Sequence, residues 1–286
     1  MVILTGVFFS NRIQFTPLTD ALNISQEVKR LKINKLLSIL ISTASGCVLC
    51  AALFSPSAHA NTLPRTRNNT TDIQRRAVNT DSATLSPKAL QYAINGYQWA
   101  VEHHKVSNPS ILTVVNFNEP SYKKRLFVID LKSGRIVMAM HVAQGKNTGA
   151  VYATHFSNQP GSRASSPGIF TTLNEYDGEH GRSLRVNGLE EGINSNALSR
   201  AVVIHPASYV TPSFIKQNGY AGRSWGCFAV SPNKANKFMS TIKGGTVLFA
   251  YASTEKHDPR VAHPLSPDGE KLYNAIIHDN SSSLFT

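Results

Sequence analysis

Short apolar runs, separated by clusters of Gly, Ser, Asn and Thr, fill the chain between Ile111 and Ala252. The runs are rich in β-branched residues and too short for typical helices, so they predict strands. The expected strands are Ile111–Phe117, Leu126–Leu131, Arg135–Ala143, 168–172, Ser183–Leu189 and Thr246–Ala252. They do not alternate regularly with helices, as the strands of a doubly wound α/β sheet would. We therefore expect a single, mainly β domain with a few helices.

Two segments have helical periodicity instead. Ser86 followed by Pro87 is typical of a helix start, and apolar residues then recur every three or four positions. A second helix is predicted over Pro232–Ile242. Residues 145–167 are rich in Asn, Ser and Gly and predict a long loop, while residues 255–286 are predicted to be a polar, weakly structured C-terminal tail.

The N-terminus has the pattern of a secretory signal. A basic cluster precedes the apolar stretch Leu36–Phe54, and Ala58-His59-Ala60 fits a signal-peptidase site. We predict a signal peptide over residues 1–60, a flexible polar linker over 61–85 and the catalytic domain over 86–254. A retained membrane anchor is the alternative, because the apolar stretch approaches the length of a span. Export to the periplasm or cell envelope, with no stable membrane span after processing, is the prediction.

The chain is basic, with a formal net charge of +12. For an exported protein such a surplus favours an anionic partner, either the cell wall or a membrane surface. The basic residues are scattered and no recognition motif accompanies them, so nucleic acid is not expected as a partner. The sequence indicates no oligomeric state.

Export determines how the three cysteines are interpreted. Cys47 and Cys50 lie in the predicted leader, so Cys227 would be the only cysteine of the mature chain. A lone thiol in an oxidising compartment is a liability unless it is buried or used. Its neighbours Ser224, Trp225 and Gly226 place Cys227 at a turn rather than inside a strand, which favours a functional thiol over an inert buried one.

His205 is the candidate base for this thiol. It ends the apolar run Ala201–Ile204 and precedes Cys227 by 22 positions, so one loop can bring the two together. Thiol acyl transfer needs such a base, whereas a buried structural histidine is the alternative. We expect the oxyanion hole at the backbone amides of Gly226 and Cys227. No cofactor is expected, and no Cys or His pair has convincing zinc-ligand spacing, so no metal is expected either.

The same segment also satisfies a competing motif. Residues 222–226 read Gly-Arg-Ser-Trp-Gly, which matches the Gly-x-Ser-x-Gly elbow of serine hydrolases. That elbow requires a strand immediately before the serine and a helix after it, but a loop is predicted before Ser224. Asp268 and His278 would be its triad partners, and both lie in the predicted tail.

A strand ending at His205, a loop, and then Ser224-Trp225-Gly226-Cys227 resemble the L,D-transpeptidases of bacterial cell walls, the YkuD-like domain. The resemblance extends over about Ile111–Tyr251 and is closest to a divergent branch that carries Ser-Trp-Gly-Cys. Three residues depart from the main branch. Pro206 replaces a glycine, Trp225 replaces a second histidine, and Ala229 replaces a polar residue.

The resemblance implies a mixed β-sandwich and a mechanism. Cys227 would attack a carbonyl of a peptidoglycan stem tetrapeptide and expel D-Ala, with His205 as base and the Pro206 carbonyl orienting the imidazole. An amine acceptor would give a 3→3 cross-link, and water as acceptor would make the protein an L,D-carboxypeptidase. A wall-binding module with an idle thiol is a further alternative. Candidate substrate contacts are Ser224, Arg223, Trp225 and His180.

Overall fold

The computed structural model describes residues 83–282. The predicted signal segment 1–60 and nearly all of the predicted linker lie outside these residues. Within residues 83–282, no helix combines the length and the apolar character that a bilayer span requires.

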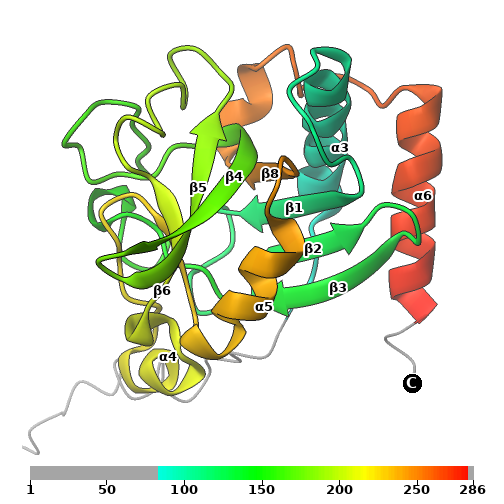
Figure 1. Cartoon of the computed structure of the whole chain (residues 1–286). Coiled ribbons are helices and arrows are strands. Elements are labelled where there is room, and N and C mark those ends of the chain that lie inside the picture. Colours follow the sequence, from blue (N-terminus) through cyan, green and yellow to red (C-terminus); the bar gives the residue numbers. More distant parts are fainter. Residues whose placement is uncertain (1–82, 283–286) are drawn as a thin grey trace, which may run out of the picture. The chain divides into compact units, whose positions relative to one another are not determined.

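The described residues form one eight-stranded sheet with helices packed against it (Figure 1). The strands are β1 (Ile111–Asn116), β2 (Leu126–Asp130), β3 (Arg135–Met140), β4 (Gly168–Gly178), β5 (Gly181–Gly188), β6 (Val203–Pro206), β7 (Phe228–Val230) and β8 (Val247–Tyr251). Their order across the sheet is β3-β2-β1-β8-β4-β5-β6-β7. Neighbouring strands are antiparallel except for the pairs β1–β8 and β6–β7, which are parallel. The prediction of a mainly β domain with a few helices is confirmed.

The sheet curls until its two edges meet. Val142, just beyond β3, forms an antiparallel bridge with Val230 at the end of β7, and the Ala143 amide donates to the Ala229 carbonyl at 2.9 Å. Both edge strands are thereby paired at one end, which satisfies backbone groups that an open edge would expose. Apolar side chains from all eight strands and from helix α5 (Pro232–Ile242) fill the inside of the curl. The bridge also brings the end of β3 next to the Cys227 turn.

Helices cover the outer face of the sheet. Strand β8 alternates strictly: Leu248 and Ala250 face the inside of the curl, while Val247 and Phe249 pack against α3 (Pro87–Glu102). Helix α3 begins where predicted, with the Ser86 hydroxyl accepting from a first-turn amide. Both faces of the central strands are therefore buried, which explains why their sequences are almost continuously apolar.

The C-terminal segment differs from the prediction. Residues after the sheet form a short 3₁₀ helix, Ser253–His257, and then helix α6 (Pro267–Ser282), which lies beside α3 and β3 (Figure 1). Ile276 of α6 is fully buried in the cluster beneath α3. The Asn95 side-chain amide of α3 donates to the carbonyls of Val261 and His263 and so ties the connecting segment down. The prediction of a weakly structured tail is wrong, because a group of apolar residues in the middle of α6 packs into the cluster that α3 and the sheet form: Leu272, Tyr273, Ile276 and Ile277.

Candidate active site

Parallel strands β6 and β7 carry the predicted imidazole and lead out of the turn that holds the predicted thiol. In their register, Ile204 lies opposite Phe228 and His205 opposite Ala229. Cys227 directly precedes β7, so continuing the register brings it beside Val203, two positions before His205. Residues two apart on a strand share a face. Cys227 and His205 therefore lie on the same side of the sheet on adjoining strands.

The Cys227 thiol lies in a partly buried niche. Its Sγ donates a weak hydrogen bond to the Ala201 carbonyl oxygen at 3.7 Å. Burial raises the pKa of the thiol, while the Val203 amide and the Arg200 guanidinium act in the opposite direction and favour the thiolate. Desolvation prevails, so the resting side chain is a neutral thiol that needs a base before it can attack.

His205 is held in the protonation state that such a base requires. Its ring is buried, and its Nδ1 lies 3.0 Å from the Pro206 carbonyl oxygen. A carbonyl only accepts, so Nδ1 carries the proton and Nε2 is left as the acceptor in the neutral ring. Burial lowers the pKa of His205, with the Pro206 carbonyl opposing this shift and His180 adding to it. The Pro206 contact is the one that the family resemblance implies.

His180 lies against the His205 ring. The two ring centroids are 4.4 Å apart, with 29° between the ring planes. His180 is exposed at the turn between β4 and β5, whereas His205 is 3 % exposed. His180 therefore covers the imidazole from the solvent side and stands at the mouth of the site.

Ser224 has a structural position. Its hydroxyl donates to the Cys227 carbonyl at 2.7 Å and accepts from the Gly226 amide at 3.1 Å, and the residue is 5 % exposed. Its backbone pairs with Gln144 and Lys146. The Gly226 amide is thus already engaged, and the expectation that it contributes to an oxyanion hole is wrong for this conformation. The Ser224 hydroxyl is likewise committed to the turn rather than directed at a substrate.

The serine-hydrolase elbow does not have its required surroundings. Ser224 follows a loop and precedes a turn into β7, so neither the strand before it nor the helix after it is present. Its proposed partners Asp268 and His278 lie on α6, and Asp268 pairs with Lys271 at 2.9 Å. Within residues 222–226, Ser224 and Gly226 serve the turn before Cys227, where the Ser224 hydroxyl bonds to the turn backbone.

Two candidate substrate contacts lie at the surface beside Cys227. Trp225 is 69 % exposed, and the guanidinium of Arg163 stacks over its ring at 4.3 Å. Arg223 is exposed on the same turn. Arg163 comes from the long loop over residues 145–167, so this loop and the cysteine turn together form the rim of the site.

Sequence reasoning missed an arginine that supports this rim. Arg125, at the end of β2 nearest the turn, is fully buried, and its guanidinium donates to the Val142 carbonyl, the Glu119 carbonyl and the Gln144 side chain. Burial lowers its pKa to about 9. It holds the segment after β3 that pairs with Ser224. A single basic residue at the start of an apolar run carries no signal that would reveal this role.

One group of carboxylates has the spacing of a metal site. Ligand atoms of Glu190, Glu255 and Asp258 lie within 4.8 Å of one another, and all three residues are buried. Arg260 pairs with Asp258 at 2.9 Å and approaches Glu190 at 3.4 Å. Burial raises the pKa of Glu190 to about 9 and that of Glu255 to about 7. Bound protons and Arg260 thus neutralise much of the negative charge of these three carboxylates, so little is left to attract a metal cation.

These raised pKa values predict a pH-dependent stability. The pKa of Glu190 is about 9 in the folded protein and about 4.5 in the unfolded chain. Its tighter proton binding therefore contributes fully to stability below about pH 4.5. That contribution is lost as the pH rises toward about 9. We expect the free energy of unfolding to fall by several kcal/mol between pH 5 and pH 9, a Tm drop of roughly 10 °C. Thermal unfolding monitored by circular dichroism across this range measures it.

Glu190→Gln mimics the protonated carboxyl and should flatten most of this slope. Glu175→Gln is the matched control, because Arg182 and Lys243 lower the pKa of Glu175 and its charge change falls below this pH range. An unchanged slope in Glu190→Gln would show that Glu190 is ionised in the folded protein.

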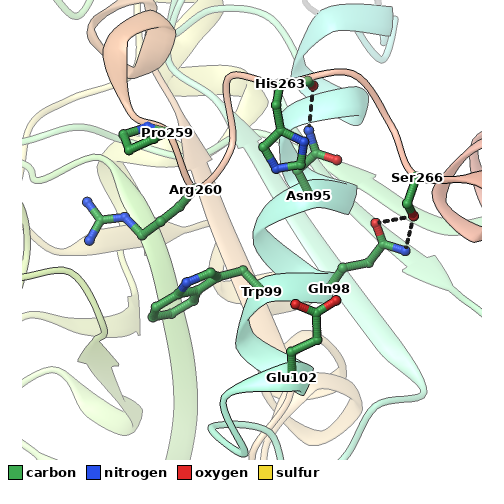
Figure 2. Close-up of a pocket in the computed structure, with 8 residues that line it drawn as sticks. All are labelled: Asn95, Gln98, Trp99, Glu102, Pro259, Arg260, His263 and Ser266. Atoms are coloured by element: carbon green, nitrogen blue, oxygen red, sulfur yellow. Dashed lines mark hydrogen bonds between the residues drawn. The ribbon is translucent and has the colours of Figure 1, made fainter.

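A cavity of about 300 Å³ lies elsewhere on the domain, between α3 and the segment before α6 (Figure 2). The residues that line it are Asn95, Gln98, Trp99, Glu102, Pro259, Arg260, His263 and Ser266. Figure 2 shows Gln98 bonded to Ser266 and Asn95 bonded to the His263 carbonyl, so much of the polar lining is already paired within the wall. No lining residue belongs to the Cys227 site.

The protein is thus a mainly β domain in which Cys227 lies beside β6, the strand that carries His205. The chain belongs to the L,D-transpeptidase catalytic domain family, whose model matches residues 81–251. Similar solved structures include an L,D-transpeptidase from Mycobacterium smegmatis, 18% identical with a TM-score of 0.32, and the LD transpeptidase LdtMt1 in complex with imipenem, 16% identical with a TM-score of 0.31. Each alignment covers 50% of this chain and 59% of the solved chain. A search of curated proteins found no match.

Proposed function

We propose that the protein is a cysteine-dependent L,D-transpeptidase of peptidoglycan stem peptides, exported to the bacterial cell envelope. The observation that carries the proposal is the contact between His205 Nδ1 and the Pro206 carbonyl oxygen. These two atoms lie 3.0 Å apart, which leaves Nε2 as a base on the strand that adjoins Cys227.

The reaction follows from these two side chains. The Cys227 sulfur attacks the carbonyl carbon of the scissile amide while His205 Nε2 accepts the thiol proton. The tetrahedral intermediate collapses as the imidazolium returns that proton to the departing amine nitrogen, so that D-Ala leaves. A side-chain amine of a second stem then attacks the thioester, loses a proton to His205 and releases the thiol. The product is a 3→3 cross-link.

Water in place of the second amine gives hydrolysis instead. The rim formed by Trp225 and Arg163 is exposed and leaves the thiol accessible from solvent. L,D-carboxypeptidase activity is therefore the second candidate function, and it uses the same residues up to the thioester.

Incubation of the full chain with disaccharide-tetrapeptide muropeptides tests the proposal. Transpeptidation gives a dimer whose mass equals two monomers less one D-Ala, and hydrolysis gives a tripeptide monomer. The proposal expects D-Ala release together with the dimer. Release of D-Ala with tripeptide alone would favour the carboxypeptidase, and wall binding without any release of D-Ala would contradict both.

Trp225 is proposed as a substrate contact because it is large, exposed and adjacent to the thiol. Trp225→Ala should raise KM, lower kcat/KM by about tenfold and change stability by less than ~0.5 kcal/mol, since the side chain is 69 % exposed. Trp225→Phe retains a stacking surface and should recover most of the loss. Steady-state kinetics on the muropeptide would measure both, and an unchanged KM in Trp225→Ala would remove this residue from the binding surface.

A further inference from the structure

Arg200 is a cation whose hydrogen-bond partners are all neutral. Its guanidinium donates to four oxygens of the long loop, at 2.6–3.1 Å: the Ser157 and Ala164 carbonyls and the Ser162 and Ser166 hydroxyls. No ion pair within the described residues includes it. A partly buried guanidinium thus has its donors satisfied while its charge stays uncompensated.

This charge lies next to the cysteine turn. A Cβ atom added to Gly226 would meet the Ala164 carbonyl oxygen at 2.8 Å and the Arg200 Nη2 at 3.3 Å. Gly226 also has a φ of 121°, so only glycine is at ease there. The Arg200 guanidinium and the loop that it holds therefore pack directly against the backbone of Gly226, the residue before Cys227. Arg200 is also the chain neighbour of Ala201, whose carbonyl contacts the sulfur.

The other groups around the sulfur are either uncharged in the resting protein or exposed to solvent. His205 rests neutral, since its buried ring has a lowered pKa. Tyr209 has its pKa raised to about 12 by burial and by Cys227, so its hydroxyl stays neutral. His180 is beyond the His205 ring, and Arg163 and Arg223 are exposed at the rim, where water screens them. Arg185 lies across from Val203 on β5, but its guanidinium stacks on the Tyr176 ring at 3.9 Å. Of these cations, Arg200 is the one whose guanidinium packs against the turn itself.

We propose that Arg200 is a positioning residue for Cys227, which clamps residues 157–166 onto the cysteine turn and favours the thiolate by its uncompensated charge. This inference rests on the proposed function of Cys227 as a nucleophile. A guanidinium bonded only to neutral oxygens is suited to both tasks, because a carboxylate partner would cancel the field at the sulfur.

The test is the pH dependence of Cys227 alkylation by iodoacetamide, followed by mass spectrometry of the peptide that contains Cys227, which separates it from Cys47 and Cys50. Arg200→Met should move the midpoint of the rate profile upward by about one pH unit. Arg200→Lys retains the charge and should keep the midpoint within about 0.3 pH units, with lower thermal stability. Arg135→Met, which removes an exposed arginine at the start of β3, far along the strand from the bridge at Val142, is the control and should leave the midpoint unchanged.

A purely structural Arg200 would lower stability in both Arg200 variants without moving either midpoint, and that result would overturn the proposal. Arg200→Gln, which keeps hydrogen-bonding capacity without charge, replaces Arg200→Met if the latter does not fold. A shifted midpoint in Arg200→Lys overturns the proposal even if neither neutral variant folds. Alkylation needs no turnover, so these outcomes are independent of D-Ala release by the wild type, whose absence would count against the proposed function alone.

Discussion

Cys227→Ala should lower D-Ala release from a tetrapeptide muropeptide by about 10³-fold or more, because no other described side chain can form the thioester. The thiol is partly exposed and makes one weak hydrogen bond, so its removal should change the free energy of unfolding by less than about 1 kcal/mol. A liquid-chromatography assay of free D-Ala, together with thermal unfolding, would measure both effects.

Ser224→Ala is the informative comparison. It removes the hydrogen bonds to the Cys227 carbonyl and from the Gly226 amide, so we expect a stability loss of about 1–2 kcal/mol and a moderate loss of activity. The serine-hydrolase alternative makes the opposite forecast, with full loss in Ser224→Ala and retained activity in Cys227→Ala. The pair of variants therefore decides which residue is the nucleophile.

Arg125→Met should destabilise the domain by about 3 kcal/mol, the largest stability effect that we expect from one residue near the site. The substitution would leave the Val142 carbonyl, the Glu119 carbonyl and the Gln144 side chain without their buried donor. Since Gln144 pairs with Ser224, the cysteine turn should loosen and activity should fall as well. Urea unfolding would measure the stability change.

Arg135→Met is the matched control for this substitution. Arg135 is an exposed arginine at the start of β3, so its replacement should cost less than about 0.5 kcal/mol. Equal losses in the two variants would show that the buried hydrogen bonds of Arg125 do not support the turn.

The strands and the first helix could be predicted because their signals are local. Strand β8 is continuously apolar because both of its faces are buried, and α3 begins at a serine cap followed by proline. The proximity of Cys227 and His205 could be predicted as well, because each residue lies at one end of an apolar run that could pair with the other. Parallel pairing of β6 and β7 puts the two residues on adjoining strands.

The missed features depend on contacts that leave no periodic pattern. Arg125 and Arg200 act through backbone carbonyls and serine hydroxyls, so neither has a charged partner that could be recognised in the sequence. Helix α6 was missed because polar residues outnumber the apolar ones that pack on α3. The sequence assigns the Gly226 amide to an oxyanion hole because the competing hydrogen bond that this amide donates to the Ser224 hydroxyl forms only once the turn is folded.

The most direct measurement is the mass of the intact protein after exposure to a carbapenem, used as an acylating probe, with the adduct located by peptide mapping. The account predicts one adduct, on the peptide that contains Cys227, which is absent from Cys227→Ala. An adduct that persists in Cys227→Ala and maps to Ser224, or a wild type that gains no mass, would contradict it.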